Sequence, residues 1–256
     1  MTINILIFIF GLCIGSFMNV CIYRIPLSKS IVTPRSMCPG CGTLISTYDN
    51  IPVISYILLM GKCRNCGIHI SLRYPLVETI SGLTALAVFM RFGISAEGLV
   101  NFALISALVV ITFIDIDHRI IPDTISLPGI PAGFLLASFF LPSMNYKTSL
   151  AGILTGGGSL FAVAWIYSLI TKKEGMGGGD IKLLAMIGAF TGWKGILFTI
   201  FVASAMGTLV GIALMLKTQK DMKLAVPFGP FLSIGAILYI FFGTSLISWY
   251  FNLLAA

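Results

Sequence analysis

Long apolar stretches separated by short polar segments dominate the sequence. The apolar positions run continuously instead of alternating, which is typical of membrane helices and not of the strands of a β-barrel. A membrane-spanning helix needs about 20 mostly apolar residues. We therefore expect spans near residues 2–23, 75–92, 97–115, 125–142, 149–170, 181–193, 195–216 and 229–252. The sixth is short, so we predict about eight helices, with seven as the main alternative.

The composition also indicates that lipid surrounds much of the chain. The 256 residues are 57% hydrophobic and only 10% charged, whereas soluble domains carry about 25% charged residues. The first segment lacks a basic start and a small-residue cleavage site, so we interpret it as a retained helix and not a signal peptide. The predicted fold class is an all-α polytopic membrane protein. Its expected parts are a first transmembrane helix at 1–23, a cytoplasmic four-cysteine zinc domain at 24–74, and a transmembrane bundle at 75–256.

The basic residues predict how the chain is oriented. Loops on the cytoplasmic side of membrane proteins are enriched in lysine and arginine. If the spans alternate, one side receives Arg24, Lys29, Arg35, Lys62, Arg64, Arg73, Arg119, Lys172, Lys173, Lys182, Lys217, Lys220 and Lys223. That side should be the cytoplasm, which places the 24–74 loop inside and both termini outside. The net charge of +7 is then explained by topology, and no nucleic acid partner is required.

The 24–74 loop contains two Cys-x-x-Cys pairs, "CPGC" and "CRNC". Such pairs have the spacing of a tetrahedral four-thiolate zinc site. A loop this small buries little core, so a structural metal is a natural staple. The alternative is two disulfides, which a reducing cytoplasm disfavours. We predict a structural Zn²⁺ bound by Cys38, Cys41, Cys63 and Cys66, with turns made possible by Gly40, Gly42 and Gly67.

Carboxylates near the membrane surface are the candidates for chemistry. Asp115 ends the third expected span, and Asp180 opens the sixth after Gly177, Gly178 and Gly179. Alternation of the spans puts both acids at one depth on one side. Ionisable groups near hydrocarbon are costly and usually functional. Two such acids that meet share one proton, so one activates a water while the other donates to a carbonyl oxygen. This is the arrangement of an aspartyl protease.

Each acid also has a structural interpretation. Asp123 follows Pro122 and precedes an apolar helix, so we expect it to cap that helix. Asp117 pairs with Arg119 at the water interface or contacts substrate. Asp180 is a possible helix cap as well. A cap does not need three preceding glycines, which favour an extended, movable segment that lets another chain approach closely.

The motifs occur together in a known order. "GSFMNVCIYRIP", the two cysteine pairs, "DNIPVISYILLMGKCRNCG", "RYPLVE", "DIDHRIIPD", "EGMGGGDIKLLAMIGAF" and "PFGPFLSIGA" resemble the type IV prepilin peptidases. The similarity runs from Gly15 to about Ala236. The Gly-x-Gly-Asp element at 177–180 is shared with the wider group of intramembrane aspartyl proteases that includes presenilin.

The resemblance implies a specific activity. Members of that family cut the basic leader from prepilins and pseudopilins after a glycine, at the face of the bacterial cytoplasmic membrane. The long bacterial form also methylates the new amino terminus with S-adenosylmethionine. The catalytic aspartates of the family match Asp115 and Asp180, and its cysteine loop matches all four cysteines. Retention of that loop implies that methyl transfer is retained too.

Methyl transfer is harder to place in the sequence. No glycine-rich loop of the soluble methyl-donor type is present. Glu78 lies at the start of the second expected span beside the cysteine loop, where it either binds the amine or the methyl donor, or packs and caps. Gly156–Gly158 lies inside a span and indicates close helix packing.

Two other classes of function are compatible with parts of this pattern. A proton-coupled transporter also uses intramembrane aspartates and broken helices, but its halves usually repeat and a cytoplasmic four-cysteine loop is unexpected there. A non-catalytic assembly factor that holds pilins through its zinc loop is the third possibility. The expected partners are prepilin substrates and membrane lipid; the sequence does not indicate an oligomeric state.

Overall fold

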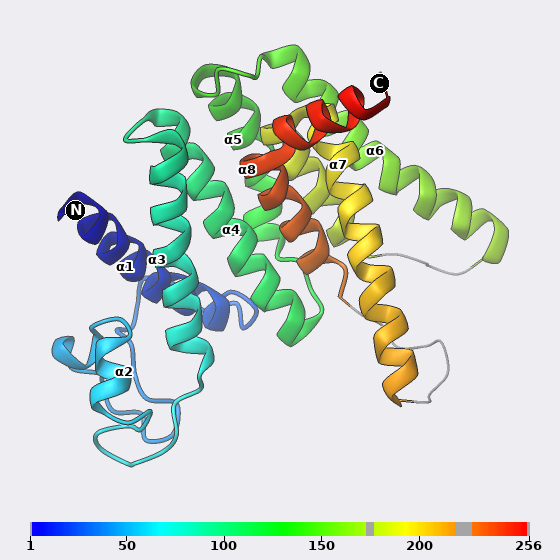
Figure 1. The fold of residues 1–256 in the computed structure, drawn as a ribbon. Helices are drawn as coiled ribbons and strands as arrows, with labels where there is room; N and C mark the ends of the chain where they lie inside the picture. Colours follow the sequence, from blue (N-terminus) through cyan, green and yellow to red (C-terminus); the bar gives the residue numbers. More distant parts are fainter. Residues whose placement is uncertain (1, 173–176, 219–226, 255–256) are drawn as a thin grey trace. The chain divides into compact units, whose positions relative to one another are not determined.

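The computed structural model describes residues 2–172, 177–218 and 227–254. The elements in chain order are α1 (Thr2–Arg24), η1 (Thr47–Asn50), α2 (Ile54–Leu58), α3 (Arg73–Phe92), α4 (Ala96–His118), α5 (Asp123–Phe140), α6 (Tyr146–Thr171), α7 (Gly178–Thr218) and α8 (Gly229–Leu254) (Figure 1). The predicted all-α class is confirmed, because the described residues contain helices and only isolated β-bridges. The short helices η1 and α2, in the cysteine loop, were not expected.

The chain divides into two compact units, Met1–Val110 and Ile111–Ala256. The first holds α1, the cysteine loop, α3 and most of α4; the second holds the last turns of α4 and α5 to α8. The three-part division at residues 24 and 75 stays a prediction.

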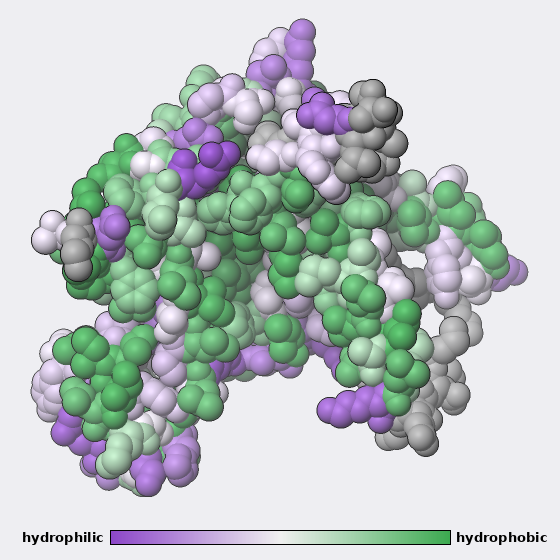
Figure 2. All heavy atoms as spheres, viewed as in Figure 1, coloured by the Kyte–Doolittle hydropathy of each residue, from purple (hydrophilic) through white to green (hydrophobic). Residues whose placement is uncertain are grey.

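Six of the described helices are long and apolar enough to cross a membrane: α1, α3, α4, α5, α6 and α7. The described part of α8 adds a shorter apolar helix, Gly229–Gly243. Figure 2 shows hydrophobic residues over most of the visible surface of the helices. Large apolar side chains such as Phe161, Ile170 and Phe201 are exposed, as expected where lipid is the solvent. The protein is a multi-pass membrane protein.

Helix α7 has 41 residues and contains two of the predicted spans, which are two helical segments joined at a kink. The backbone is non-helical at Gly192, where φ is 68° and ψ is −179°. This combination is accessible only to glycine. The predicted boundary between 193 and 195 therefore falls within three residues of a real break.

Small residues let the helices of each unit approach closely. In the first unit, Gly11 and Gly15 of α1 lie against α3, and the Ser81 hydroxyl donates to the Gly11 carbonyl at 2.7 Å. In the second, Gly152 of α6 lies against Gly188 of α7. Such contacts hold membrane helices together by close backbone packing. At Gly156 the predicted close packing is confirmed, since an added Cβ would lie 2.5 Å from the Leu184 carbonyl oxygen, whereas Gly158 faces open space.

Candidate active site and metal centre

The second unit brings Asp115 and Asp180 together. Asp115 lies in the last turn of α4 and is 5% exposed, and Asp180 lies in the first turn of α7 and is half-buried. The two carboxyl groups are near enough to interact electrostatically although they are separated by 65 positions in the chain. The structure therefore places these two acids, which the sequence nominated separately, in one site.

A backbone N–H fixes one oxygen of this pair. The Gly229 N–H, at the start of α8, donates to Asp115 Oδ2 at 3.0 Å. The first N–H groups of a helix have no partner inside that helix, and the positive end of the helix dipole favours a carboxylate. Asp115 thus supplies the acceptor for α8 from another helix.

Gly229 must be glycine for this contact to exist. A Cβ on Gly229 would lie 2.6 Å from Asp115 Oδ2 and 3.5 Å from Ile121 Cδ1. The sequence interpretation noted "PFGPFL" only as part of a resemblance and gave Gly229 no role. The sequence does hold a signal for Gly229, which lies between Pro227 and Pro230 at the start of an apolar run. Proline is common in the first turn of a helix, because it has no N–H that needs a partner.

Ile121 joins the same site to the glycine-rich segment. A Cβ on Gly179 would lie 2.9 Å from the Ile121 Cβ, whereas Gly177 and Gly178 face open space. Gly178 and Gly179 belong to the first turn of α7, so the extended segment expected there is wrong for these two residues. A side chain at Gly179 is excluded because Ile121 lies so close, and not because the backbone is left-handed.

Asp123 does not cap its helix, so that prediction is wrong. The N-cap of α5 is Pro122, and no side chain caps it. The Asp123 carboxylate instead accepts two hydrogen bonds from Lys182 Nζ, each 2.8 Å long. This ion pair joins the start of α5 to the start of α7, beside the two acids of the site. Sequence reasoning missed Lys182, because its partner is 59 residues away.

Besides Asp123, Asp117 and Glu174 are the other acids close to this pair in the sequence. Asp117 is exposed at the end of α4. Glu174 lies outside the described residues. Within the described part of the second unit, Asp115 and Asp180 are thus the acids that come together.

The four predicted metal ligands converge in the first unit. The thiol sulfurs of Cys38, Cys41, Cys63 and Cys66 all lie within 4.8 Å of one another, and all four cysteines are free. The Cys38 and Cys66 sulfurs are 3.8 Å apart. A tetrahedral Zn²⁺ with Zn–S bonds of about 2.3 Å holds its sulfurs about 3.8 Å apart. The donor set and its spacing therefore fit zinc.

Each cysteine pair sits on the same local turn. The Gly42 N–H donates to the Cys38 carbonyl, and the Gly67 N–H donates to the Cys63 carbonyl. Gly42 and Gly67 have φ of 69° and 70°, so the predicted need for glycine is confirmed at both. Gly40 has no positive φ; an added Cβ there would meet Ile68.

The ligands also have hydrogen-bonding partners. Contacts of Cys41 with the side chain and backbone of Thr43, and with the side-chain amide of Asn65, lower the pKa of Cys41 to about 6. A thiol with a lowered pKa is more readily present as the thiolate that binds metal.

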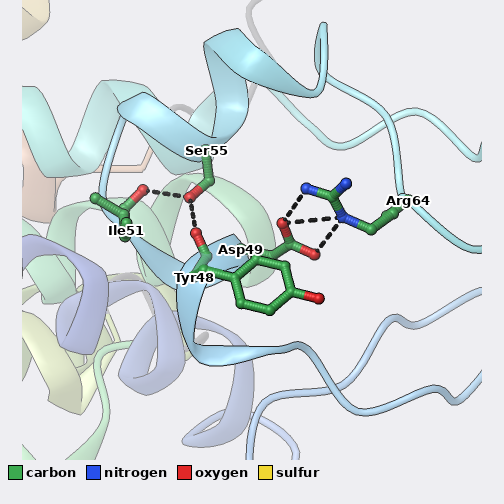
Figure 3. A network of polar contacts seen from close by, with 5 residues as sticks. All are labelled: Tyr48, Asp49, Ile51, Ser55 and Arg64. Atoms are coloured by element: carbon green, nitrogen blue, oxygen red, sulfur yellow. Dashed lines mark hydrogen bonds and ion pairs between the residues drawn. The ribbon is translucent and has the colours of Figure 1, made fainter.

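A polar network ties this centre to the preceding loop (Figure 3). Arg64, between the second pair of cysteines, holds Asp49 of η1 by hydrogen bonds of 2.7 to 3.2 Å. The Arg64 guanidinium lowers the pKa of Asp49. The Ser55 hydroxyl of α2 contacts the carbonyls of Tyr48 and Ile51 at 3.1 and 2.8 Å. The short elements η1 and α2 are thereby fixed to the second cysteine turn.

Glu78, in α3, also faces this loop. It is 7% exposed, and its Oε2 accepts a hydrogen bond of 2.8 Å from the Val53 N–H. The Ser16 side chain of α1 hydrogen-bonds to the same carboxyl group. Glu78 therefore connects two membrane helices with the cysteine loop.

A pair of acids at a membrane-helix end and a four-cysteine metal centre define a class of polytopic membrane protein with a separate polar module. Comparison with known proteins identifies which. The model of the bacterial peptidase A24 N-terminal domain matches residues 9–92, and that of the type IV leader peptidase family matches residues 102–212. The chain belongs to the type IV leader peptidase family.

Three relatives named prepilin leader peptidase/N-methyltransferase illustrate the similarity. The protein from Myxococcus xanthus is 42% identical over 216 residues, which cover 84% of this chain and 64% of the relative. Those from Pseudomonas putida and Aeromonas hydrophila are 37% and 35% identical, over 92% and 96% of this chain and 89% and 92% of the relatives. The chain thus spans less than two thirds of the Myxococcus relative and most of the other two. No solved structure matches the chain.

Proposed function

We propose that this protein cleaves the basic leader of type IV prepilins and pseudopilins after a glycine, with Asp115 and Asp180 as the catalytic pair. The observation that carries the proposal is the meeting of these two carboxyl groups at the ends of α4 and α7. Membership of a leader peptidase family supports the reaction class. Asp115 is deeply buried, and burying a carboxyl group near hydrocarbon is costly, so such groups usually have a function.

The proposed mechanism gives each carboxyl group a separate role. In the proposed mechanism the two carboxyl groups share one proton. One of them activates a water molecule toward the scissile carbonyl carbon, while the other donates its proton to the carbonyl oxygen. The Gly229 N–H holds Asp115 Oδ2, which orients this carboxyl group from the start of α8. Lys182 and Asp123 hold the starts of α7 and α5 together beside the pair.

The depth of the proposed active site matches the expected position of the scissile bond in a prepilin. A prepilin has an apolar helix in the bilayer and a basic leader in the cytoplasm, so its cleavage site lies at the depth of helix ends. We place the 24–74 loop and the active site on the cytoplasmic side of the inner membrane, with both termini outside, from the bias of basic residues. Asp117, exposed near the pair, attracts the leader.

Methyl transfer is the second proposed activity. S-adenosylmethionine supplies an electrophilic methyl group to the newly exposed amine. Zn²⁺ bound by Cys38, Cys41, Cys63 and Cys66 stiffens the loop of the first unit, and Glu78 binds the methyl donor or the amine. The N-methyltransferase part of the relatives' names supports this activity.

Cleavage of a synthetic prepilin by the purified full chain in detergent, with and without S-adenosylmethionine, tests the proposal. Asp115→Asn and Asp180→Asn should each lower kcat by about 100- to 10,000-fold, because each removes a proton-transfer group. Glu97→Gln is the matched control, since Glu97 lies in the first turn of α4, at the opposite end of the helix that bears Asp115. Full activity of either aspartate variant, with intact metal content, would refute the assignment.

A further inference from the structure

An apolar surface is exposed on the cysteine loop around α2. Its large side chains have exposed fractions from 53% to 81%, and we call them the α2 patch: Ile54, Ile57, Leu58 and Met60. Figure 2 shows hydrophobic residues over this part of the loop and hydrophilic residues toward its far end. Contiguous apolar patches on a surface usually mark contacts with a membrane or with another protein.

The other side of the same segment packs against the loop. Ser55 is buried, and its hydroxyl donates to the carbonyls of Tyr48 and Ile51. The Tyr56 hydroxyl donates to the Ile70 carbonyl at 3.2 Å. These bonds fix the orientation of α2, so the α2 patch is held outward.

Glu78 holds this segment beside a membrane helix. The Val53 N–H, directly before α2, donates to Glu78 Oε2 at 2.8 Å. Because each helical residue advances about 1.5 Å, the Glu78 Cα lies about 8 Å along α3 from Arg73. Helical side chains lean toward the start of their helix, so Val53 lies beside the first turns of α3. The α2 patch therefore begins at the depth of the end of a membrane helix.

Exposed apolar side chains continue from this level along α3. They recur at spacings of four and seven residues, which lie on one face of a helix: Leu72, Leu76, Leu83 and Met90. Helix α3 is long and apolar enough to cross a membrane, so this face contacts lipid. The Ile70 N–H donates to the Gly61 carbonyl at 2.8 Å, which brings the end of the α2 patch next to the residues that lead into α3. The patch is thus continuous with a lipid-facing surface.

The charge around the patch also suits a bilayer surface. Residues 24–74 contain six basic residues and one acid, Asp49, and that acid is paired with Arg64. Lys62 is exposed, two residues after Met60. Basic residues beside a membrane are attracted to anionic lipid headgroups. Segments that lie in the bilayer surface combine such residues with apolar side chains.

We propose that the α2 patch lies in the bilayer surface, with its four side chains among the acyl chains and Lys62 at the headgroup phosphates. The cysteine loop is then anchored to lipid between α1 and α3 and is not surrounded by water on all sides. The inference concerns the first unit alone and depends on neither proposed activity. A second copy of the chain and the second unit are the other occupants that the patch would suit, and each gives a different product in the test.

Photo-crosslinking of the full chain in vesicles of phosphatidylethanolamine and phosphatidylglycerol tests the proposal. With p-benzoylphenylalanine in place of Leu58, irradiation should give a phospholipid adduct on the peptide that contains position 58, detected by mass spectrometry. The same group in place of Pro39 is the control. Pro39 is exposed between the first pair of cysteines, outside the α2 patch, and should give no lipid adduct.

Three results of this experiment would overturn the proposal. They are a crosslink from position 58 to a second copy of the chain, a crosslink from position 58 to residues 111–256, and a lipid yield at position 58 no higher than at position 39. The first two results would show that protein covers the patch, and the third that the patch is not selectively in lipid.

Aspartate substitutions give an independent measure. Leu58 and Met60 are mostly exposed, so the double variant Leu58→Asp, Met60→Asp should fold normally. Charged side chains are unfavourable among acyl chains, so the segment should leave the bilayer, and trypsin should cleave after Lys62 several-fold faster in vesicles. Pro39→Asp is the control and should leave that rate unchanged. An unchanged rate in the double variant, with native helix content by circular dichroism, would also overturn the proposal.

Discussion

The Gly229 N–H and the Asp115 carboxylate are joined by a hydrogen bond of 3.0 Å, across 114 positions of the chain. This bond orients a buried acid of the candidate site by a backbone group, which has no side-chain freedom of its own. The start of α8 therefore takes part in the site, although it contributes no chemically reactive side chain.

Gly229→Ala should inactivate cleavage without unfolding the protein. The added methyl group would lie 2.6 Å from Asp115 Oδ2, so the carboxylate must move. A displacement of about 1 Å at a reacting group commonly costs about 100-fold in rate. Gly211→Ala is the control, because a Cβ there meets nothing within 4 Å. We expect kcat for prepilin cleavage to fall in the first variant alone; equal rates would contradict the positioning role.

Gly178 and Gly179, which precede Asp180, should differ in their tolerance of alanine. Gly179→Ala places a methyl group 2.9 Å from Ile121 and should displace the first turn of α7, whereas Gly178→Ala meets no neighbour. Alanine also stabilises a helix by about 0.5–1 kcal/mol relative to glycine. Cleavage rates and thermal melting of the two variants check this. If Gly178→Ala lost activity as severely as Gly179→Ala, flexibility and not close packing would be the reason for the glycines.

Metal removal should affect the first unit selectively. Cys63→Ser removes a ligand from a set of four, and a structural zinc site with three thiolates binds much more weakly. The metal content should fall toward zero, and the 24–74 loop should become sensitive to proteases. Methylation should be lost while cleavage persists, because Asp115 and Asp180 lie in the other compact unit.

The matched control for that variant is Cys13→Ser, which changes an exposed cysteine of α1 outside the cluster. Loss of cleavage in parallel with the metal would show that the peptidase half depends on the zinc module.

The Asp49–Arg64 pair should persist at neutral pH and fail only in strong acid. Arg64 lowers the pKa of Asp49 below the ordinary value of 3.8. A lowered pKa in the folded state adds stability above the ordinary value, and this stability is lost as the pH falls through the lowered one. Between pH 5 and 8 the pair should therefore contribute constantly.

Limited proteolysis of the loop checks this pair. Arg64→Ala should make residues 47–66 more sensitive at neutral pH, and Arg64→Lys should rescue only in part, because lysine cannot make the same two-pronged contact. A protection that weakens steadily from pH 8 to pH 5 in the unmodified protein would contradict the lowered pKa.

Features that depend on neighbours in the chain were predictable from the sequence. Continuous apolar runs indicate membrane helices because each helix satisfies its own backbone in lipid. The cysteine turns follow from two-residue spacing and the glycine after each pair, as Gly42 and Gly67 show. Asp115 and Asp180 stood out individually, because a carboxyl group at the end of an apolar run is costly.

Contacts between distant segments were decided by the tertiary structure alone. Sequence spacing could not reveal that Asp123 pairs with Lys182, that Gly229 faces Asp115, or that Gly179 and not Gly178 is closely packed. Nor could it show that the Glu78 carboxylate accepts a hydrogen bond from the Val53 N–H. Local propensity determines which segments become helices, whereas the packing of one helix against another determines which atoms meet, and those meetings set the chemistry of the site.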